Sequence, residues 1–454
     1  MPEKQTKRTV FSNPVLISLL FIAIVSTWVS SNYKWGDGFW KGILKSDATG
    51  YYAYLPALFI YNDLNFNYYD SLRKETGNHD LAYEFRRKHN GSAFNKYYVG
   101  TAVLQTPFFL LGQLTSILMQ RDLDGYSAYY MIFIQIGTII YLLTGLLFLS
   151  GLLRSYQSGK RDIALVLLVI VFGTNVFHYT VSEPGMSHIY SFALITAFLF
   201  FMRSFFGSWD YRKIYLSAAL LGLILITRPV NLLIVLLIPF LAETPLNLLK
   251  GLKLIFRQPA KLMLSILIFL TVISIQFIIY KIQTGSFFLY SYPGEGFQFG
   301  DPDMINILFS YRKGLFVYCP ALFVSLFGLY FLFKRKRFAF WSWLGFFAVL
   351  TYVLSSWYQW FYGGSFSSRV YIEYYAIFGI PMALLLKHIT HKVKRGLFIA
   401  FLFLLMIFTQ IQTYQYRTGI IHWSEMNREK YWEVFPSPQY LEKEFNRRTR
   451  GNDQ

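Results

Sequence analysis

The feature that most constrains this chain is a series of apolar runs, each long enough to cross the roughly 30 Å hydrocarbon core of a bilayer as a helix. Of its 454 residues, 54% are hydrophobic and only 15% are charged, which excludes a disordered or fibrous protein. The sequence therefore predicts an all-α polytopic membrane protein with about eleven transmembrane helices. The runs begin near Pro14, Tyr126, Ile163, Ser187, Ile214, Val230, Leu262, Gly314, Phe338, Tyr371 and Gly396.

A twelfth apolar run, from Tyr97 to Leu118, could be a span or an interfacial or re-entrant helix, because polar residues, Pro107 and Gly112 interrupt it. Charge decides between these alternatives. With eleven spans and the amino terminus inside, the cytoplasmic segments hold 21 Lys and Arg residues, whereas the short outer loops hold 5. Positive residues are retained on the cytoplasmic side. A twelfth span would move the basic run Lys334–Arg337 outside, so we expect an interfacial helix.

This topology divides the chain into two regions. A transmembrane domain is expected over residues 1–413, with a long outer first loop at 31–125, and a short outer tail over 414–454. A further outer segment spans residues 283–313. Alternatively, the basic start Met1–Arg8 and the apolar run Pro14–Ser30 form a cleaved signal peptide. The aromatic residues Trp28 and Tyr33 at the end of this run favour a membrane anchor.

Asp47 is the first candidate for chemistry. It follows the first span in the outer loop and precedes Tyr51, Tyr52 and Tyr54. A charged group at the membrane boundary is costly unless it is paired or hydrated, so such groups are functional candidates. A carboxylate on the wall of an outward cavity could accept a proton from a bound hydroxyl. The alternative is that Ser46 or Asp47 simply caps the next helix.

Glu183 is the second acidic candidate. Its short outer loop carries no Lys or Arg, which indicates a carboxylate without a local partner, free to point into the cavity. The alternative is a solvated loop acid. His188 follows five residues later and enters the next span, where it is either a ligand-binding side chain or a hydrogen-bonded core residue.

The outward cations form a third group, and they are the exceptions to the charge asymmetry. Arg and Lys bind phosphate oxygens, Arg in bidentate fashion, so these residues are candidates for a lipid-phosphate site. The alternative is that their side chains reach out to ordinary lipid headgroups. The candidates are Lys96, Arg228, Arg312, Lys313 and Arg369.

The segment 357–369 combines aromatic residues with Gln359, a Gly-Gly pair and Ser residues. Aromatic faces beside hydrogen-bonding groups suit a sugar, and Trp360 is the candidate stacking residue. The two glycines allow the backbone to approach a ligand. An interfacial aromatic belt explains Trp357 and Trp360, but it does not explain Gly363, Gly364 or Arg369.

Several classes of site are excluded. The sequence lacks a Walker-type phosphate loop, a His-Glu-x-x-His motif and a Gly-x-Ser-x-Gly elbow. Its single cysteine, Cys319, rules out an internal disulfide and a cysteine-based metal site. The net charge of +19 is accounted for mostly by helix orientation, so nucleic acid is not expected as a partner. No cofactor is required; a divalent metal between Asp47 and Glu183 is conceivable but is not predicted.

On these residues the chain resembles the type-C glycosyltransferase superfamily, which includes protein O-mannosyltransferases, aminoarabinose transferases that modify lipid A, and oligosaccharyltransferases. The resemblance implies a catalytic Asp soon after the first span, here Asp47, followed by juxtamembrane helices in the first outer loop. It further implies a second acid in the next outer loop, here Glu183, and a phosphate-binding Lys, here Lys96. The chain departs from the O-mannosyltransferase Asp-Glu pair, because Ala48 follows Asp47.

The expected function is therefore a transferase in a bacterial inner membrane, with its active site on the outer face. It would move a sugar from a polyprenyl-phosphate donor to a glycan, lipid or protein acceptor of the cell envelope with inversion, and Asp47 would be the general base. The alternatives are a transporter or flippase for a lipid-linked saccharide, or a polymerase or ligase that shares the donor chemistry.

Overall fold

The computed structural model describes residues 13–36 and 38–435. The predicted signal-peptide residues Met1–Arg8 and the part of the predicted outer tail beyond residue 435 lie outside this range. Helices make up nearly all of the regular structure, and one short hairpin supplies the strands of the described chain.

Seven helices are long and apolar enough to cross a membrane, or eight if one bent pair is counted as a span. The chain is thus an all-α, multi-pass membrane protein, as the sequence predicts, but the count of eleven spans is not confirmed. Six of the seven correspond to predicted runs, and the seventh is the interrupted run after Tyr97. They are α1 (Pro14–Lys34), α4 (Gly100–Leu118), α5 (Ala128–Ser155), α8 (Ser187–Ser208), α12 (Pro259–Thr284), α17 (Arg337–Ser355) and α19 (Lys392–Arg417).

The other five apolar runs form shorter or broken helices. Proline explains several of the breaks, because it cannot donate a backbone hydrogen bond within a helix. Pro320 starts a new helix directly after Cys319, and Pro229 starts the 3-10 segment after Arg228. These elements are α6 (Lys160–Phe172), α7 (Val176–Val181), α9 (Arg212–Thr227), η4 (Pro229–Leu237), α10 (Ile238–Ala242), α14 (Leu315–Tyr318), α15 (Pro320–Ser325), η5 (Leu326–Gly328), α16 (Leu329–Arg335), η6 (Arg369–Tyr374) and α18 (Ala376–His388).

Helix α4 is continuous through Pro107, and it packs against α5, α2 (Asp47–Phe59) and α9. Its glycine at position 112 allows close approach to α5, since a Cβ there would lie 2.8 Å from the Cα of Tyr130. The expected interfacial location of this helix stays a prediction, because its length and hydropathy also suit a span.

The long first loop is folded rather than extended. It contains α2, a short antiparallel hairpin and several small helices, and it leads directly into α4. In the hairpin, Arg86 pairs with Asn95 and His89 with Ser92. The remaining elements of the loops and tail are η2 (Phe39–Ile43), α3 (Tyr69–Thr76), η3 (His79–Ala82), β1 (Arg86–His89), β2 (Ser92–Asn95), α11 (Pro245–Phe256), α13 (Met304–Phe309) and α20 (Arg428–Val434).

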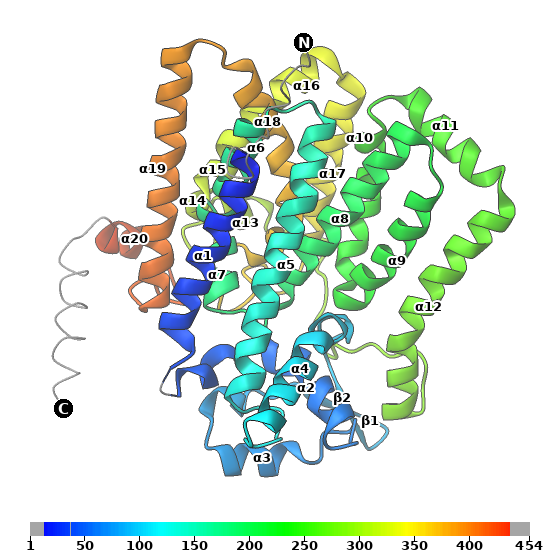
Figure 1. Cartoon of the computed structure of the whole chain (residues 1–454), viewed down its shortest axis with the longest axis vertical. Helices are drawn as coiled ribbons and strands as arrows, with labels where there is room; N and C mark the ends of the chain where they lie inside the picture. The colour runs from blue at the N-terminus through cyan, green and yellow to red at the C-terminus, as the bar shows by residue number, and fades with distance from the viewer. Residues whose placement is uncertain (1–12, 37, 436–454) are drawn as a thin grey trace, which may run out of the picture.

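The predicted cytoplasmic segments gather at one end of the bundle. Glu243 pairs there with Arg203 at 3.1 Å and with Lys336 at 2.7 Å, and Asp162 pairs with Arg395. Figure 1 shows α16 at this upper end, while α3 and the hairpin of β1 and β2 lie at the opposite end. The folded first loop and the basic segments are therefore on opposite sides of the helices.

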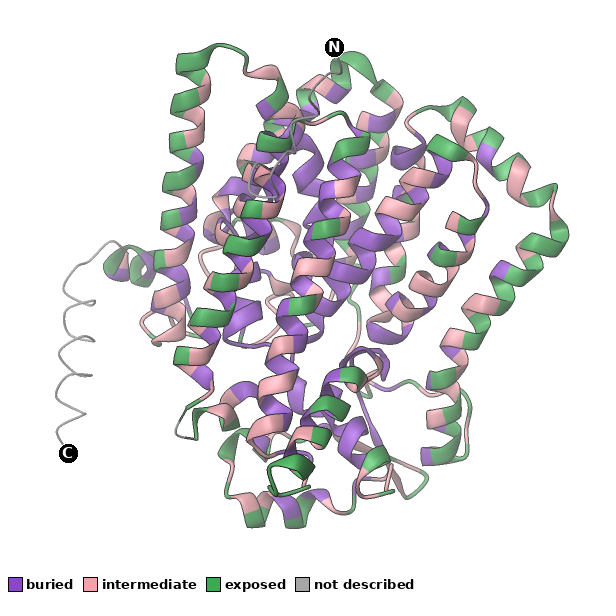
Figure 2. Ribbon diagram, in the orientation of Figure 1, coloured by how far each residue is buried: buried purple, intermediate pink, exposed green. Residues whose placement is uncertain are grey.

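Burial separates the centre of the bundle from its lipid-facing rim. In α8, 78% of the most apolar window is buried, against 17% in α12 and 28% in α19. The rim helices instead expose large apolar side chains such as Met263 at 70% and Leu404 at 64% (Figure 2). Apolar surface of this extent is unfavourable in water, so these helices face hydrocarbon.

Candidate functional site

A cavity of about 510 Å³ lies where the first loop meets the ends of several membrane helices. Its walls come from the start of α2, the segment before α4, the junction of α9 and η4, and the outer segments around residues 290–297 and 357–364. Four of the predicted site residues line this cavity: Asp47, Lys96, Arg228 and Arg369.

Asp47 is the first residue of α2, and both of its carboxylate oxygens have partners. Oδ2 lies 2.8 Å from Nη2 of Arg369, and Oδ1 accepts a hydrogen bond of 2.8 Å from the Tyr97 hydroxyl. Ser46, the residue before α2, makes no side-chain capping bond. These contacts disfavour the capping alternative, because the acid is directed at side chains of the cavity.

The backbone of α2 brings Tyr97 to Asp47. A Cβ at Gly50 would collide with the Tyr97 ring, so only glycine permits this close packing. Asn95 secures it by donating from Nδ2 to the Gly50 carbonyl at 2.7 Å. Tyr97 also exchanges a hydrogen bond of 2.6 Å with the Tyr83 hydroxyl, which extends the network away from the carboxylate.

The charge state of Asp47 follows from these neighbours. Burial on its own raises the pKa of Asp47, but Arg369, the Tyr97 hydroxyl and Lys96 together hold the pKa below its ordinary value. The carboxylate is thus ionised at neutral pH, and it can accept a proton only from a group that is becoming strongly acidic.

Lys96 also lines the cavity and is buried among aromatic rings. Its Nζ lies 3.1 Å from Oε1 of Glu295, and Arg87 approaches the same oxygen at 3.8 Å. The rings of Tyr83, Tyr97 and Tyr292 lie 5.7, 5.2 and 5.6 Å from Nζ. Cation–π contacts of this kind hold an ammonium group in a partly desolvated place.

Arg228 belongs to a buried group that the sequence did not reveal in full. Its Nη1 lies 3.1 Å from Oε1 of Glu373, and the same oxygen lies 3.0 Å from Nδ1 of His188. Glu373 is completely buried, and its second oxygen has no hydrogen-bond partner. His188 is buried in α8 and is not among the residues lining the cavity, so it contacts the site only through Glu373 and Arg228.

Glu183 differs from the expectation of a carboxylate without a local partner. Its Oε1 lies 3.4 Å from Nε2 of His178 and 3.7 Å from Nζ of Lys45, and Glu183 is not among the residues lining the cavity. Burial raises the pKa of Glu183, but His178 and Lys45 outweigh burial and lower it. Lys45 precedes Asp47 by two residues. Glu183 is therefore linked to the segment that carries Asp47 through Lys45, although Glu183 does not line the cavity.

Three further candidates do not line the cavity. Arg312 donates from Nε to the Ser424 carbonyl at 3.0 Å and stacks 3.5 Å from the Phe361 ring centre. Lys313 donates to the carbonyls of Trp423, at 2.6 Å, and Ser365. These irregular segments offer backbone oxygens without helical partners, and the two cations satisfy them. Trp360 packs beside Phe361. Arg312 and Lys313 are thus not among the residues that line the cavity with Lys96 and Arg369, and the expected convergence of the four cations stays a prediction.

The aromatic walls come from two outer segments joined by backbone hydrogen bonds. The amide of Tyr358 donates to the Gly296 carbonyl at 3.0 Å, and that of Gln298 donates to the Ser356 carbonyl at 2.6 Å. Their pairing places Trp357 against Phe297 and edge to face with Tyr292, 6.0 Å between ring centres, and all three residues line the cavity. The predicted segment 357–369 thus contributes to the cavity, through Trp357 and Gly363 rather than Trp360.

No group of three or more His, Cys, Asp or Glu residues that could hold a metal ion occurs within residues 13–36 and 38–435. Asp47 is occupied by Arg369 and Tyr97, and Glu183 by Lys45 and His178. The residues nearest the cavity are arranged as ion pairs between side chains.

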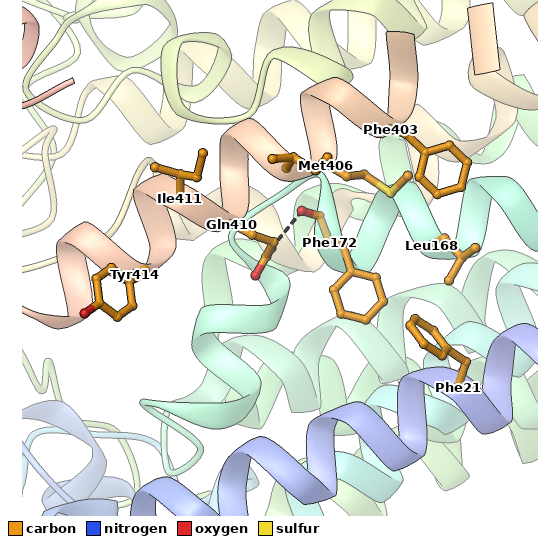
Figure 3. Close-up of a pocket in the computed structure, with 9 residues that line it drawn as sticks. Phe21, Leu168, Phe172, Phe403, Met406, Gln410, Ile411 and Tyr414 are labelled. Carbon is orange, nitrogen blue, oxygen red and sulfur yellow. Dashed lines mark hydrogen bonds between the residues drawn. The ribbon is translucent and has the colours of Figure 1, made fainter. Parts of the chain in front are cut away.

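A different kind of hollow lies between α1, α6 and α19 (Figure 3). This groove of about 490 Å³ is lined by residues such as Phe21, Leu168 and Phe403, with no acidic or basic side chain among them. Gln410 closes its floor by donating to the Phe172 carbonyl at 2.7 Å. The groove suits an apolar chain, whereas the first cavity holds the ionisable groups.

Comparisons with known proteins give limited guidance. No protein-family model and no curated protein matches the sequence. Among solved structures, the archaeal oligosaccharyltransferase AglB from Archaeoglobus fulgidus, in complex with an inhibitory peptide and a dolichol-phosphate, is similar at 12% identity and a TM-score of 0.47 over 95% of this chain and 59% of its own. The A. fulgidus oligosaccharyltransferase with Zn and sulfate is similar at 13% identity and a TM-score of 0.47, over 94% of this chain and 56% of its own. This chain spans less than three fifths of either length, so its function has to be sought in its own residues.

Proposed function

We propose that this chain is a membrane glycosyltransferase that moves a sugar from a polyprenyl-phosphate donor to a cell-envelope acceptor at the outer face of a bacterial inner membrane. One observation carries the proposal: two carboxylates, three cations and several aromatic faces line the same cavity beside the first outer loop. This set matches the groups that sugar transfer from a lipid phosphate requires.

The reaction is a single displacement at the anomeric carbon. The acceptor hydroxyl attacks that carbon and loses its proton to Asp47 as the new carbon–oxygen bond forms. The bond to the phosphate oxygen breaks with its electron pair, and the configuration inverts. Because the pKa of Asp47 is lowered, the proton moves late, when the attacking oxygen has already become strongly acidic.

The leaving phosphate gains negative charge during this step. Fixed cations contribute most where charge develops in the transition state. Lys96, Arg228 and Arg369 line the cavity and supply that charge, and Arg369 also orients Asp47. Glu183 is assigned a positioning role, because it holds Lys45 beside the start of α2.

The sugar itself would lie against the aromatic walls. Sugar CH groups stack on ring faces while hydroxyls take hydrogen bonds. Trp357 and Tyr292 supply such faces, and Gln359 supplies an amide in the same lining.

A transporter or flippase for a lipid-linked saccharide is the second candidate, and a polymerase or ligase would share the donor chemistry. Transporters usually place polar groups near the bilayer midplane on broken helices. Here the ionisable groups lie where the first outer loop meets the helix ends, which favours an enzyme.

Replacing Asp47 by Asn tests the proposal in a purified transfer assay with polyprenyl-phosphate sugars. Asn keeps the shape but removes the basicity, so turnover should fall about 100-fold to 10,000-fold while donor binding persists. The matched control is Asp63→Asn, since Asp63 lies in the same loop and accepts backbone hydrogen bonds outside the cavity. Normal turnover by Asp47→Asn would remove Asp47 from the mechanism.

A further inference from the structure

Two acids, Asp47 and Glu295, line the cavity together with its three cations, and a third acid, Glu373, is completely buried. Each of the three cations that line it within the described chain is paired with a carboxylate: Lys96 with Glu295 at 3.1 Å, Arg228 with Glu373 at 3.1 Å, and Arg369 with Asp47 at 2.8 Å. An arriving phosphate therefore finds every cation neutralised. A phosphate that displaced one of these carboxylates would bind a cation without a competing acid.

Two of the pairs are fixed by the surrounding structure. Glu373 is completely buried in η6 and also contacts His188 at 3.0 Å. Asp47 is held at the start of α2 by the Tyr97 hydroxyl as well as by Arg369. Opening the Arg228–Glu373 pair would leave a completely buried carboxylate without its partner, which is strongly unfavourable, and the Arg369–Asp47 pair is held by the additional hydrogen bond from Tyr97.

The third pair joins a fixed cation to a movable acid. Lys96 is held between three tyrosine rings, and 8% of its side chain is exposed, against 18% for Glu295. Glu295 lies between Gly294 and Gly296, in the segment between α12 and α13, which forms no helix. The backbone of Gly294 has φ of +80°, a region that glycine enters without strain. Glu295 can leave Lys96 by rotation of its own side chain, while hydrogen bonds with Tyr290, Tyr292 and Tyr358 hold the backbone of its segment.

The charges of the two competitors match. The phosphate of a polyprenyl-phosphate sugar is a diester with one negative charge, and the carboxylate of Glu295 also carries one negative charge. Exchange of one for the other leaves the negative charge beside Lys96 and Arg87 unchanged. Release of the sugar turns the phosphate into a monoester, whose charge at neutral pH approaches −2.

We propose that Glu295 is the exchangeable counterion of the site: a donor phosphate binds by taking its place on Lys96, and Glu295 competes with the phosphate throughout. This rests on the function proposed above. It has an uncommon consequence, because removing the negative charge of a residue in the cavity wall should tighten ligand binding.

Binding of farnesyl phosphate to the purified full-length protein, measured by calorimetry in detergent, tests this competition. Glu295→Gln keeps the size and hydrogen bonding of the side chain but releases the charge of Lys96, so binding should become roughly 10-fold tighter. Lys96→Gln should weaken binding by a similar factor or more. Asp301→Asn is the matched control, because it removes one negative charge from the same segment at a residue that does not line the cavity.

The outcomes separate this inference from the proposed function. If Glu295→Gln and Glu295→Ala bind farnesyl phosphate as tightly as the wild type or more weakly, Glu295 only forms part of the cavity wall and does not compete with phosphate, which would overturn the inference. Equal tightening by Asp301→Asn would reduce the effect to general charge and also overturn it. If Lys96→Gln has no effect on the binding of farnesyl phosphate, or if neither the wild type nor Glu295→Gln binds it, the proposed lipid-phosphate donor is also contradicted.

Discussion

The two ends of the helix bundle both carry ion pairs, but the pairs differ in kind. At the basic end, Glu243 is 13% exposed and bonds Arg203 and the half-exposed Lys336. At the cavity end, Glu373 has no exposed side-chain surface, and it shares one oxygen between Arg228 and His188. Hydrated pairs contribute little to stability, whereas a buried pair that loses one partner is costly. The pair at the cavity end is thus the more deeply buried of the two.

The largest expected contrast concerns sidedness. Cys319 is completely buried, so an introduced cysteine should be the only thiol that reacts. An impermeant maleimide should label Glu75→Cys, in the first loop, on intact cells. It should label Lys394→Cys, at the start of α19, only after permeabilisation, because the positive-inside rule places that end in the cytoplasm. Labelling of Lys394→Cys on intact cells, with Glu75→Cys protected, would reverse the assigned orientation.

Truncating the two acids should separate the two kinds of ion pair. Glu373→Ala leaves Arg228 without its buried partner and should lower the free energy of unfolding by about 3 to 5 kcal/mol. Glu243→Ala should cost about 1 kcal/mol, because its partners can be hydrated. Thermal unfolding of the purified protein in detergent compares them. Equal losses in the free energy of unfolding for the two variants would show that the burial of an ion pair does not decide its contribution to stability.

The smallest expected effect is the pH dependence caused by Lys313. Burial, reinforced by Arg369, lowers the pKa of Lys313 to about 7, whereas its ordinary value is 10.5. Between these values the unfolded chain binds a proton that the folded chain does not, so stability rises with pH above about 7. The slope is at most about 1.4 kcal/mol per pH unit.

Unfolding measured between pH 7 and pH 9 should therefore show a flatter profile for Lys313→Met than for the wild type. Lys253→Met, on α11 at the basic end, is the control and should leave the profile unchanged. Parallel profiles for the wild type and Lys313→Met would mean that Lys313 stays protonated in the fold.

The sequence identified many groups of the site because charge at a membrane boundary is rare and costly. Asp47, Lys96, Arg228 and Arg369 could be selected on that ground, and all four line the cavity. The acidic partners of Lys96 and Arg228 were not selected. Glu295 looks like one acid among several in the segment between α12 and α13, whereas Glu373 lies two residues inside the apolar run from Tyr371, where the same rule on charge would have selected it.

The sequence also does not reveal the partners of the predicted site residues that do not line the cavity. Arg312 and Lys313 have the residue types of a phosphate site, but backbone carbonyls at positions 365, 423 and 424 bind them instead. Glu183 has no basic neighbour in its own loop, yet Lys45 and His178 reach it. A side chain's partner depends on which distant segments the fold brings within about 3 Å, and composition does not encode that directly.

The sequence by itself determined that this chain folds as apolar helices in a membrane, with a basic end and a long first loop. Those properties follow from local hydropathy and from summed charge, which need no knowledge of contacts. Only the tertiary structure decided which charges neutralise one another, since Arg369 meets Asp47 across 322 residues of sequence. An ion pair forms only when its two side chains come within a few ångströms, and the packing of the helices decides which distant segments come that close.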